Sequence, residues 1–178
     1  VQRVPAHTRL GTLRDRIGRG PLPMAEVTRI GIALCDALVR LHHAGLLHRD
    51  IKPGNIGFDG DGTPKLLDFG LALPIDSTRT LGSSMAGTPL YLPPEAWQGQ
   101  PTSHQVDLWG LSMTLCEAFL GFHPLVGITP EELQDGAAGD ASGRAEPHLP
   151  IESRALFARA LARDPDQRFE DAAALRAA

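Results

Sequence analysis

The sequence predicts a mainly α fold, in which a helical bundle surrounds one central buried helix and carries a small β-hairpin. Three observations indicate this class. Residues 106–120 place apolar side chains on every side of a helix, which is typical of a helix at the centre of a domain. Residues 23–43 repeat apolar side chains at three- and four-residue steps, which predicts an amphipathic helix. Residues 59–62 are a Gly/Asp cluster between two short apolar stretches and predict a hairpin turn.

The N-terminal part is predicted to contain a short helix followed by a long one. Residues 1–12 have no clear period and predict an irregular segment, whereas residues 13–17 predict a single helical turn. The long helix over residues 23–43 ends in two histidines. We interpret His42 and His43 as surface side chains that the helix dipole favours.

The hairpin is expected to pair residues 56–58 with residues 65–67, with its midpoint between residues 61 and 62. Residues at equal distances from the centre of a hairpin face each other, and Asn55 and Asp68 meet this condition. The hairpin would therefore bring an amide oxygen and a carboxylate side by side at its open end, and such oxygen ligands suit Mg²⁺.

Asp107 lies near the start of the central helix, where burying a carboxylate without partners would be costly. We expect it to accept backbone N–H groups; the alternative is a simple acidic residue at a helix N-terminus. Thr102 and Ser103 offer an N-cap for this helix. The segments expected after it are a helix over residues 130–134, an extended and mobile stretch over 136–150, a helix over 151–163 and a final helix over 171–177.

Length and charge indicate one domain and limit the classes of partner. The chain has 178 residues, the size of an ordinary domain, and a net charge of −4 with its basic residues scattered. This distribution argues against nucleic acid and against an anionic membrane surface as partners.

The cysteines and the absence of a long apolar run predict a soluble, cytoplasmic protein. Cys35 and Cys116 fall inside apolar helical patterns without C-x-x-C spacing, which predicts two buried thiols, no disulfide and a reducing compartment. No uncharged apolar run of about 18 residues occurs, and the N-terminus lacks the layout of a signal peptide. The first residue is Val rather than Met, which fits an excised or truncated piece of something longer. The abundance of Arg, Ala, Gly and Pro indicates a bacterial source.

The stretch from residue 48 to residue 70 carries the chemistry. It reads His48-Arg49-Asp50, then Lys52, Asn55 and, after the hairpin, Asp68-Phe69-Gly70. This order and spacing resemble the protein-kinase signature H-R-D-x-K-x-x-N followed by D-F-G. The alternative, a surface loop that carries these charges by accident, would not explain so many fixed positions.

The resemblance implies a serine/threonine protein kinase that uses ATP and Mg²⁺. It implies that Asp50 is the catalytic base that accepts the substrate hydroxyl proton, and that Lys52 steadies the γ-phosphate. Lysine at position 52 is similar to the serine/threonine class rather than to tyrosine kinases. Asn55 and Asp68 would be the metal ligands, while His48, Arg49, Phe69 and Gly70 complete the two motifs with structural roles.

The polar segment after Gly70 resembles the activation segment of kinases, although an ordinary connecting loop is the alternative. Gly87-Thr88 and Pro93-Pro94-Glu95 resemble its closing part, in which the hydroxyl of Thr88 would be held by the catalytic Asp and Lys. Phosphorylation is expected because Arg49 could pair with a dianion, although Leu73 stands where a basic residue is often found. The candidate phosphoacceptors are Thr78, Thr80, Ser83 and Ser84.

Two long-range contacts are also implied by the resemblance. Asp107 matches the family's aspartate that holds the H-R-D loop. Residues 164–169 resemble the closing D-P-x-x-R motif, whose arginine pairs with the glutamate of A-P-E. Glu95 and Arg168 are therefore the expected buried ion pair, the alternative being a surface arginine.

The resemblance covers residues 1–178 as one kinase-like domain, but only as the larger, helical C-terminal lobe. Residues 1–12 would lie at the hinge between the lobes. A complete site also needs a Gly-rich loop, a strand lysine and a helix glutamate, and none is found. Lys52 lies in the loop and Lys65 in the hairpin, so neither can be the strand lysine. Gly57 is a further departure, because the family usually has an apolar side chain there under the adenine ring.

Three interpretations remain open. The first is an ATP-dependent kinase of protein Ser/Thr hydroxyls whose N-terminal lobe, or a partner chain covering the ATP face, lies outside this chain. The second is a catalytically inactive, kinase-like binding module. The third is a small-molecule phosphotransferase, which Gly87-Thr88 and Pro93-Pro94-Glu95 disfavour. Fold alone would not separate the three.

Overall fold

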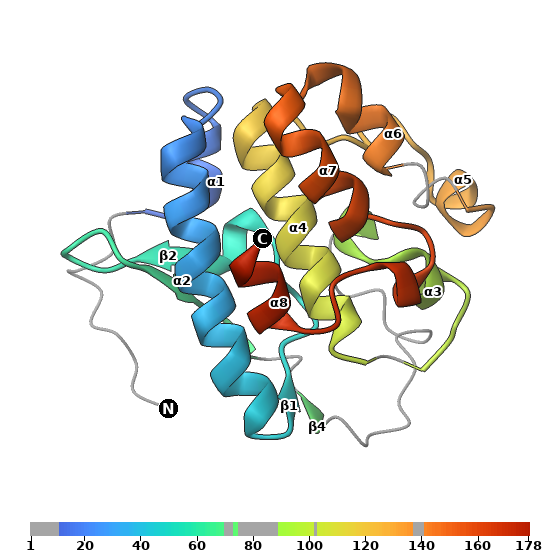
Figure 1. Cartoon of the computed structure of the whole chain (residues 1–178), viewed down its shortest axis with the longest axis horizontal. Helices are drawn as coiled ribbons and strands as arrows, with labels where there is room; N and C mark the ends of the chain where they lie inside the picture. Colours follow the sequence, from blue (N-terminus) through green and yellow to red (C-terminus); the bar gives the residue numbers. More distant parts are fainter. Residues whose placement is uncertain (1–10, 70–72, 75–88, 102, 137–140) are drawn as a thin grey trace.

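The structure is a computed structural model that describes residues 11–69, 73–74, 89–101, 103–136 and 141–178 (Figure 1). Its architecture is mainly helical, as predicted. The α-helices are α1 (Leu13–Ile17), α2 (Met24–His43), α3 (Pro94–Trp97), α4 (Gln105–Leu120), α5 (Pro130–Gln134), α6 (Ala141–Ala145), α7 (Ile151–Ala160) and α8 (Ala172–Ala177). The strands are β1 (Leu46–Leu47), β2 (Ile56–Phe58), β3 (Pro64–Leu66) and β4 (Leu73–Pro74). Short 3₁₀ turns occupy η2 (Pro53–Asn55), η4 (Pro89–Tyr91), η6 (Glu146–His148) and η7 (Pro165–Gln167).

Helix α4 is the centre of the bundle, as the sequence predicted. Every residue from Val106 to Ala118 is buried, because α2 packs on one side and α7 on the other, while α8 lies across α2 (Figure 1). The helix ends at Gly121, whose φ of 79° is accessible to glycine at little cost.

Helix α2 is the long amphipathic helix. Its buried stripe consists of Val27, Ile30, Leu34, Cys35 and Leu38, which are the three- and four-residue steps of the prediction. This stripe faces α4, and the carboxyl end of α2 leads through β1 into residues 48–52.

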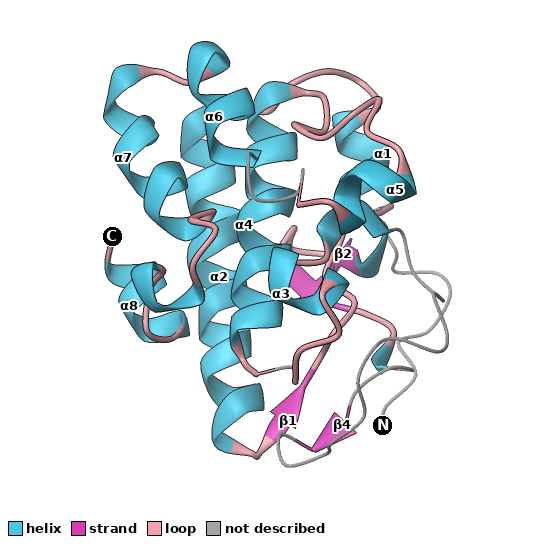
Figure 2. Ribbon diagram, turned by 90° about the vertical axis from the view of Figure 1, so that its right-hand side faces the viewer, coloured by secondary structure: helices cyan, strands magenta, loops and turns pink. Residues whose placement is uncertain are grey.

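Two small antiparallel sheets lie away from α7 and α8, beside the central helices (Figure 2). One pairs β1 with β4, with Leu46 opposite Pro74. The other is the predicted hairpin of β2 and β3, with Ile56 opposite Leu66 and Phe58 opposite Pro64. The second strand therefore begins one residue earlier than predicted.

The predicted hairpin register was wrong by one residue. Asn55 is opposite Leu67, whose N–H donates to the Asn55 carbonyl at 2.8 Å, and not opposite Asp68. The turn is the reason. The Asp59 side chain accepts the N–H of Asp61 at 3.2 Å and that of Thr63 at 2.8 Å, and Gly62 adopts a φ of 76°. This Asx-type turn centres the loop on Asp61 instead of between residues 61 and 62.

The C-terminal third differs from the prediction in two places. The stretch expected to be extended contains α6 and η6, because Ala141 and Ala145 are fully buried and supply a small apolar face one turn apart. Helix α7 ends at Ala160 rather than at residue 163. The carbonyls of Ala162 and Arg163 accept hydrogen bonds from the Arg168 guanidinium instead, and Pro165 disfavours helix just before it.

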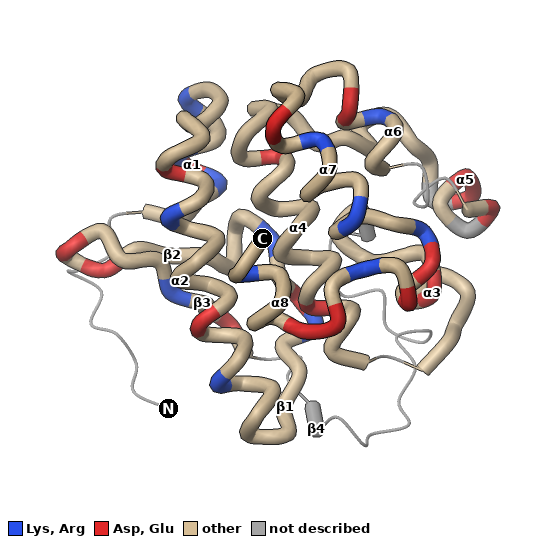
Figure 3. Tube along the Cα trace, in the orientation of Figure 1, with Lys and Arg blue, Asp and Glu red and all other residues tan. Residues whose placement is uncertain are grey.

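Charged residues of both signs are distributed over the described part of the chain. Acidic residues gather at the tip of the hairpin and on α5, while Lys and Arg are spread over α1, α2 and α7 (Figure 3). Among the described residues, no helix has both the length and the hydropathy needed to cross a bilayer.

Candidate active site

The loop over residues 48–52 is fixed from below by the buried carboxylate of Asp107. The Oδ2 atom of Asp107 accepts the N–H of His48 at 2.8 Å, and Oδ1 accepts that of Arg49 at 2.7 Å. The prediction that this carboxylate accepts backbone N–H groups is confirmed. Arg49 has a φ of 65°, a left-handed conformation that costs an L-residue about 1–2 kcal/mol. The two hydrogen bonds from Asp107 stabilise this conformation.

His42 is not the surface residue that the sequence indicated. Its Nε2 atom lies 2.9 Å from the Oδ2 atom of Asp107, and its side chain is only 12% exposed. The prediction that His42 lies at the end of the helix is correct, but its partner Asp107 is 65 residues away in the sequence. No local pattern could have shown this contact.

Asp50 is held by two neighbours in the loop. Lys52 Nζ lies 2.8 Å from each carboxylate oxygen of Asp50. The Asn55 amide nitrogen donates to the Asp50 carbonyl at 2.8 Å and to Oδ2 at 2.7 Å. These contacts fix the position of the carboxylate that the resemblance assigns as a base.

Asn55 and Asp68 both lie at the open end of the hairpin, although they are not directly opposite. Because the amide nitrogen of Asn55 binds Asp50, its Oδ1 atom is the one side-chain atom of Asn55 that could ligate a cation. Asp68 is exposed, with a φ of 58°. An amide oxygen, a carboxylate and room for solvent fit the chemistry of Mg²⁺. Among the described residues, no group of three or more His, Cys, Asp or Glu side chains could hold a metal ion instead.

His48 connects this loop to the hairpin. The Asp50 N–H points to its Nδ1 at 3.4 Å, so Nε2 is the donor to the Leu67 carbonyl at 3.0 Å. The His48 ring also contacts the ring of Phe69, with centroids 4.9 Å apart. Phe69 nevertheless remains 46% exposed.

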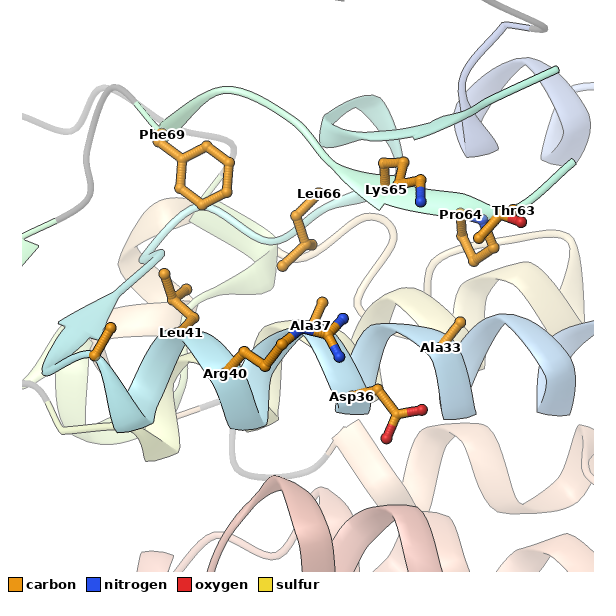
Figure 4. Close-up of a pocket in the computed structure, with 11 residues that line it drawn as sticks. Ala33, Asp36, Ala37, Arg40, Leu41, Thr63, Pro64, Lys65, Leu66 and Phe69 are labelled. Carbon is orange, nitrogen blue, oxygen red and sulfur yellow. The ribbon is translucent and has the colours of Figure 1, made fainter. Parts of the chain in front are cut away.

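A groove of about 580 Å³ runs between α2 and β3 and ends at Phe69 (Figure 4). Leu66 and Phe69 from the hairpin side face Ala37 and Leu41 on α2, while Arg40 and Asp36 lie along the helix. The groove gives the hairpin an apolar face next to the proposed metal ligands.

Glu95 and Arg168 form the predicted ion pair. The Nη1–Oε1 and Nη2–Oε2 distances are both 2.7 Å, and the two side chains are 13% and 1% exposed. The guanidinium also lies 4.7 Å from the ring centroid of Trp109. The pair thus connects α3 to the loop before α8, next to the N-terminal end of α4. Each carboxylate oxygen of Glu95 meets one nitrogen of the Arg168 guanidinium, so the two charges neutralise each other.

Sequence reasoning missed a buried polar cluster of Tyr91, Glu117 and His123. The Tyr91 hydroxyl donates to Glu117 Oε2, and the rings of Tyr91 and His123 meet edge to face with centroids 4.8 Å apart. Burial raises the pKa of Glu117 and that of Tyr91. Burial, aided by the charge of Arg14, lowers the pKa of His123 to about 4. A glutamate within the apolar helix over residues 106–120 was the signal that could have revealed this cluster.

Six of the predicted site residues lie outside the described residues: Gly70, Thr78, Thr80, Ser83, Ser84 and Thr88.

The comparisons with known proteins agree with the motifs. The protein kinase domain family matches residues 5–177. The serine/threonine-protein kinase PknB of Mycobacterium leprae is 33% identical over 172 residues, which are 93% of this chain and 28% of that protein. A probable serine/threonine-protein kinase of Clostridium perfringens is 33% identical over 168 residues, 90% of this chain and 24% of that protein. Serine/threonine-protein kinase 36 of Mus musculus is 40% identical over 105 residues, 59% of this chain and 8% of that protein.

The chain spans about a quarter of the length of these two bacterial relatives. The protein kinase domain family nevertheless matches almost all of the 178 residues of this chain. The resemblance that residues 48–70 indicated is thereby confirmed, and the chain belongs to the protein kinase domain family.

Proposed function

We propose that this chain is the catalytic lobe of an ATP-dependent protein kinase, which transfers the γ-phosphate of ATP to Ser or Thr hydroxyls of a protein. The observation that carries the proposal is the loop over residues 48–55. There, Asp50 is held at 2.8 Å by Lys52 and at 2.7 Å by Asn55, while Asp107 fixes the loop backbone. Phosphoryl transfer depends mainly on such positioning and on charge stabilisation.

Each residue of the site has a distinct role in this proposal. Asp50 accepts the proton of the attacking hydroxyl at its carboxylate. Lys52, which already lies between the two carboxylate oxygens of Asp50, offers its positive charge to the γ-phosphate. Asn55 Oδ1 and the Asp68 carboxylate would hold Mg²⁺, and the bound ion would supply positive charge that offsets the charge of the ATP phosphates.

The proposal includes a covering lobe. The groove at Phe69 and the exposed ring of that residue support a contact with an N-terminal lobe or a partner chain, which would supply the Gly-rich loop, the strand lysine and the helix glutamate. It also includes Thr88 as the hydroxyl near the catalytic residues, with Thr78, Thr80, Ser83 and Ser84 as phosphoacceptors. The two free, buried cysteines and the bacterial relatives support a bacterial cytoplasmic enzyme.

Asp50→Asn is the experiment that tests the proposal, in a protein that carries both this chain and an N-terminal lobe. We expect kcat for a Ser/Thr peptide to fall about 10²–10⁴-fold, the usual contribution of a positioned base. The circular dichroism spectrum should not change.

Asp61→Asn is the matched control. It makes the same chemical change at the exposed tip of the hairpin, and kcat should stay within a factor of about two. A loss of less than about tenfold in Asp50→Asn would show that Asp50 is not the base. A fully inactive wild-type protein would favour the inactive binding module instead.

A further inference from the structure

Helix α1 carries a group of arginines beside the loop of the candidate site (Figure 3). Arg14 and Arg16 lie in the helix, and Arg19 follows its C-terminal end. A groove of about 990 Å³ runs along the helix, and all three arginines line it. The roles proposed above for the site residues leave this groove unused.

Arg14 adjoins the residues that hold the proposed base. A Cβ atom built on Gly54 would lie 3.6 Å from Arg14 Nε, so the guanidinium group is directly beside the backbone of η2. The next residue is Asn55, whose amide nitrogen donates to Asp50 Oδ2 at 2.7 Å. An extended peptide advances about 3.3 Å per residue. A peptide whose hydroxyl lies at Asp50 can therefore bring a side chain a few residues away to Arg14.

Arg16 is already occupied by contacts within the chain. Its Nη1 atom lies 2.8 Å from Glu26 Oε1, and its guanidinium carbon lies 3.4 Å from the ring centroid of Phe58. This arginine thus fixes α1 against α2 and the hairpin, and its charge is offset by that of Glu26.

Arg14 and Arg19 are different. Both are exposed, and neither forms an ion pair within the part of the chain that the structure describes. The second carboxylate of the groove belongs to Asp15, which accepts the N–H of Thr12 at 2.6 Å and its hydroxyl at 2.9 Å. The groove therefore presents two unpaired positive charges to solvent next to the proposed base.

The buried Glu117 does not neutralise Arg14 by direct contact. Burial raises the pKa of the Glu117 carboxyl, and the charge of Arg14 counteracts this effect, so the two residues are near each other. The Tyr91 hydroxyl, however, is the group that donates to Glu117 Oε2. The guanidinium of Arg14 is thus available to a group that enters the groove.

We propose that Arg14 and Arg19 select protein substrates that carry Asp or Glu close to the phosphorylated Ser or Thr. Guanidinium groups bind carboxylates with paired hydrogen bonds, and charge complementarity of this kind sets the choice of partner. This inference rests on the proposed function, because it names the substrate class of the same site. Arg14 and Arg19 are specificity residues, with no part in the chemical step.

Three peptides with one shared acceptor Thr test the inference in the protein that carries both lobes. They have Glu, Gln or Lys at the second to fourth positions from the Thr, and one series is made for each side of it. Two exposed ion pairs together change an affinity by about tenfold. In one series we expect kcat/KM to be about tenfold higher for Glu than for Gln, through KM, and lowest for Lys. Equal values for Glu and Gln in both series would overturn the inference.

The double variant Arg14→Gln with Arg19→Gln should lose the preference for Glu and keep the wild-type kcat/KM for the Gln peptide. Arg29→Gln is the matched control, because Arg29 is also exposed but bonds the Gly62 carbonyl at the tip of the hairpin, at 3.2 Å. Its preference should stay within a factor of about two of wild type, as for a distant surface charge. An equal loss for all three peptides in the double variant would mean that Arg14 and Arg19 only support the loop, and the inference would be wrong.

Charge reversal is the most specific test. Arg14→Glu with Arg19→Glu should make the Lys peptide a better substrate than the Glu peptide. Raising the ionic strength from about 0.05 M to about 0.5 M should reduce both the wild-type preference and the reversed one, because the charges are exposed. The unfolding temperature is measured on the same preparations, and the Gln variants decide the question if the reversed variant does not fold. A folded variant that still prefers Glu would contradict the assignment.

Peptide binding without ATP separates the inference from the proposed function. Fluorescence anisotropy of the labelled peptides should show tighter binding of the Glu peptide than of the Lys peptide, and Arg14→Gln with Arg19→Gln should remove the difference. Such binding without any phosphate transfer would contradict the proposed function alone. Phosphate transfer with no difference between the peptides, in affinity or in kcat/KM, would overturn the inference alone.

Discussion

Asp107 shows how one buried residue can position a whole loop. Its carboxylate is 0% exposed and contacts His42, His48 and Arg49. Each of these groups would otherwise be a buried donor without a partner, which costs about 1–3 kcal/mol per group. The left-handed backbone at Arg49 is unfavourable by itself, so these hydrogen bonds are needed to stabilise it. A single buried carboxylate thus stabilises the conformation of the loop.

We expect Asp107→Ala to lower the free energy of unfolding by about 3 kcal/mol or more, because two backbone N–H groups would lose their acceptor. His42→Gln should cost less than half as much, since it leaves both of those hydrogen bonds intact. Urea unfolding of the two variants measures the difference. Equal losses would mean that the contact with His42, rather than the loop backbone, is what Asp107 stabilises.

His123 should make stability depend on pH. The Leu125 N–H donates to its Nδ1 at 3.0 Å, so the neutral ring carries its proton on Nε2. That atom is buried and has no hydrogen-bond partner among the described residues. Burial, together with the charge of Arg14, lowers the pKa of His123 from 6.5 to about 4. The unfolded chain therefore binds a proton more readily than the folded one in this range.

Neutral His123 makes its full contribution to the free energy of unfolding above pH 6.5, and this contribution is lost as the pH falls toward 4. Between pH 7 and pH 4.5 the expected loss is about 2–3 kcal/mol. Glu117, whose pKa is raised by burial, acts in the opposite direction, because its charged form disfavours the folded state as the pH rises. Urea unfolding at both pH values should therefore show a smaller pH dependence of this sign in His123→Leu. An unchanged pH dependence would rule out His123 as its source.

At the level of elements, the Glu95–Arg168 pair holds together segments that are far apart in the sequence. Glu95 belongs to α3 and Arg168 to the loop between η7 and α8. Arg168 also bonds the carbonyls of Ala162 and Arg163, so it closes the end of α7. The pair therefore stabilises three elements around the foot of α4.

We expect Glu95→Ala and Arg168→Ala each to destabilise the fold by about 3–5 kcal/mol, because each leaves a buried charge without its partner. The double variant should cost clearly less than the sum. The matched control is the pair Arg176–Asp36, which has the same distance of 2.7 Å but side chains that are 46% and 43% exposed. Its removal should cost less than about 1 kcal/mol. Additive losses for Glu95 and Arg168 would show that they do not act as a pair.

At the level of the whole molecule, the proposed function makes the described residues one side of a nucleotide site. In that proposal, the loop of Asp50 would supply the base and the open end of the hairpin would supply the metal ligands. The groove between α2 and β3, with Phe69 46% exposed at its end, supplies an apolar face. These surfaces fit a lobe that would cover them.

The chain by itself is therefore expected to be inactive. Residues 1–178 mixed with Mg²⁺-ATP and a basic protein should transfer no phosphate, and calorimetry should detect no micromolar binding, because a Gly-rich loop, a strand lysine and a helix glutamate are needed for positioning. The control is Asp50→Asn, which identifies contaminating kinases. Sustained transfer that this substitution abolishes would mean that the lobe has its own phosphate clamp.

The sequence by itself determined the class of fold, the main helices and the identity of the candidate site. The central helix could be predicted because its apolar side chains project on every side of its axis. Helices α1, α2 and α5 could be predicted because periodicity and caps are local signals. The candidate site could also be predicted, because its motif is local. It consists of neighbouring residues in one loop: His48, Asp50, Lys52 and Asn55. The Glu95–Arg168 contact came only from the resemblance to the family.

Only the tertiary structure decided what depends on distant partners. The hairpin register followed from the Asx-type turn at Asp59, and His42 found its partner in Asp107. The helix over Ala141–Ala145 formed because packing buries two small residues that carry little pattern of their own. The cluster of Tyr91, Glu117 and His123 was equally hidden. In each case the free energy comes from a neighbour that is remote in sequence or across a strand, and local propensity contains no information about that neighbour.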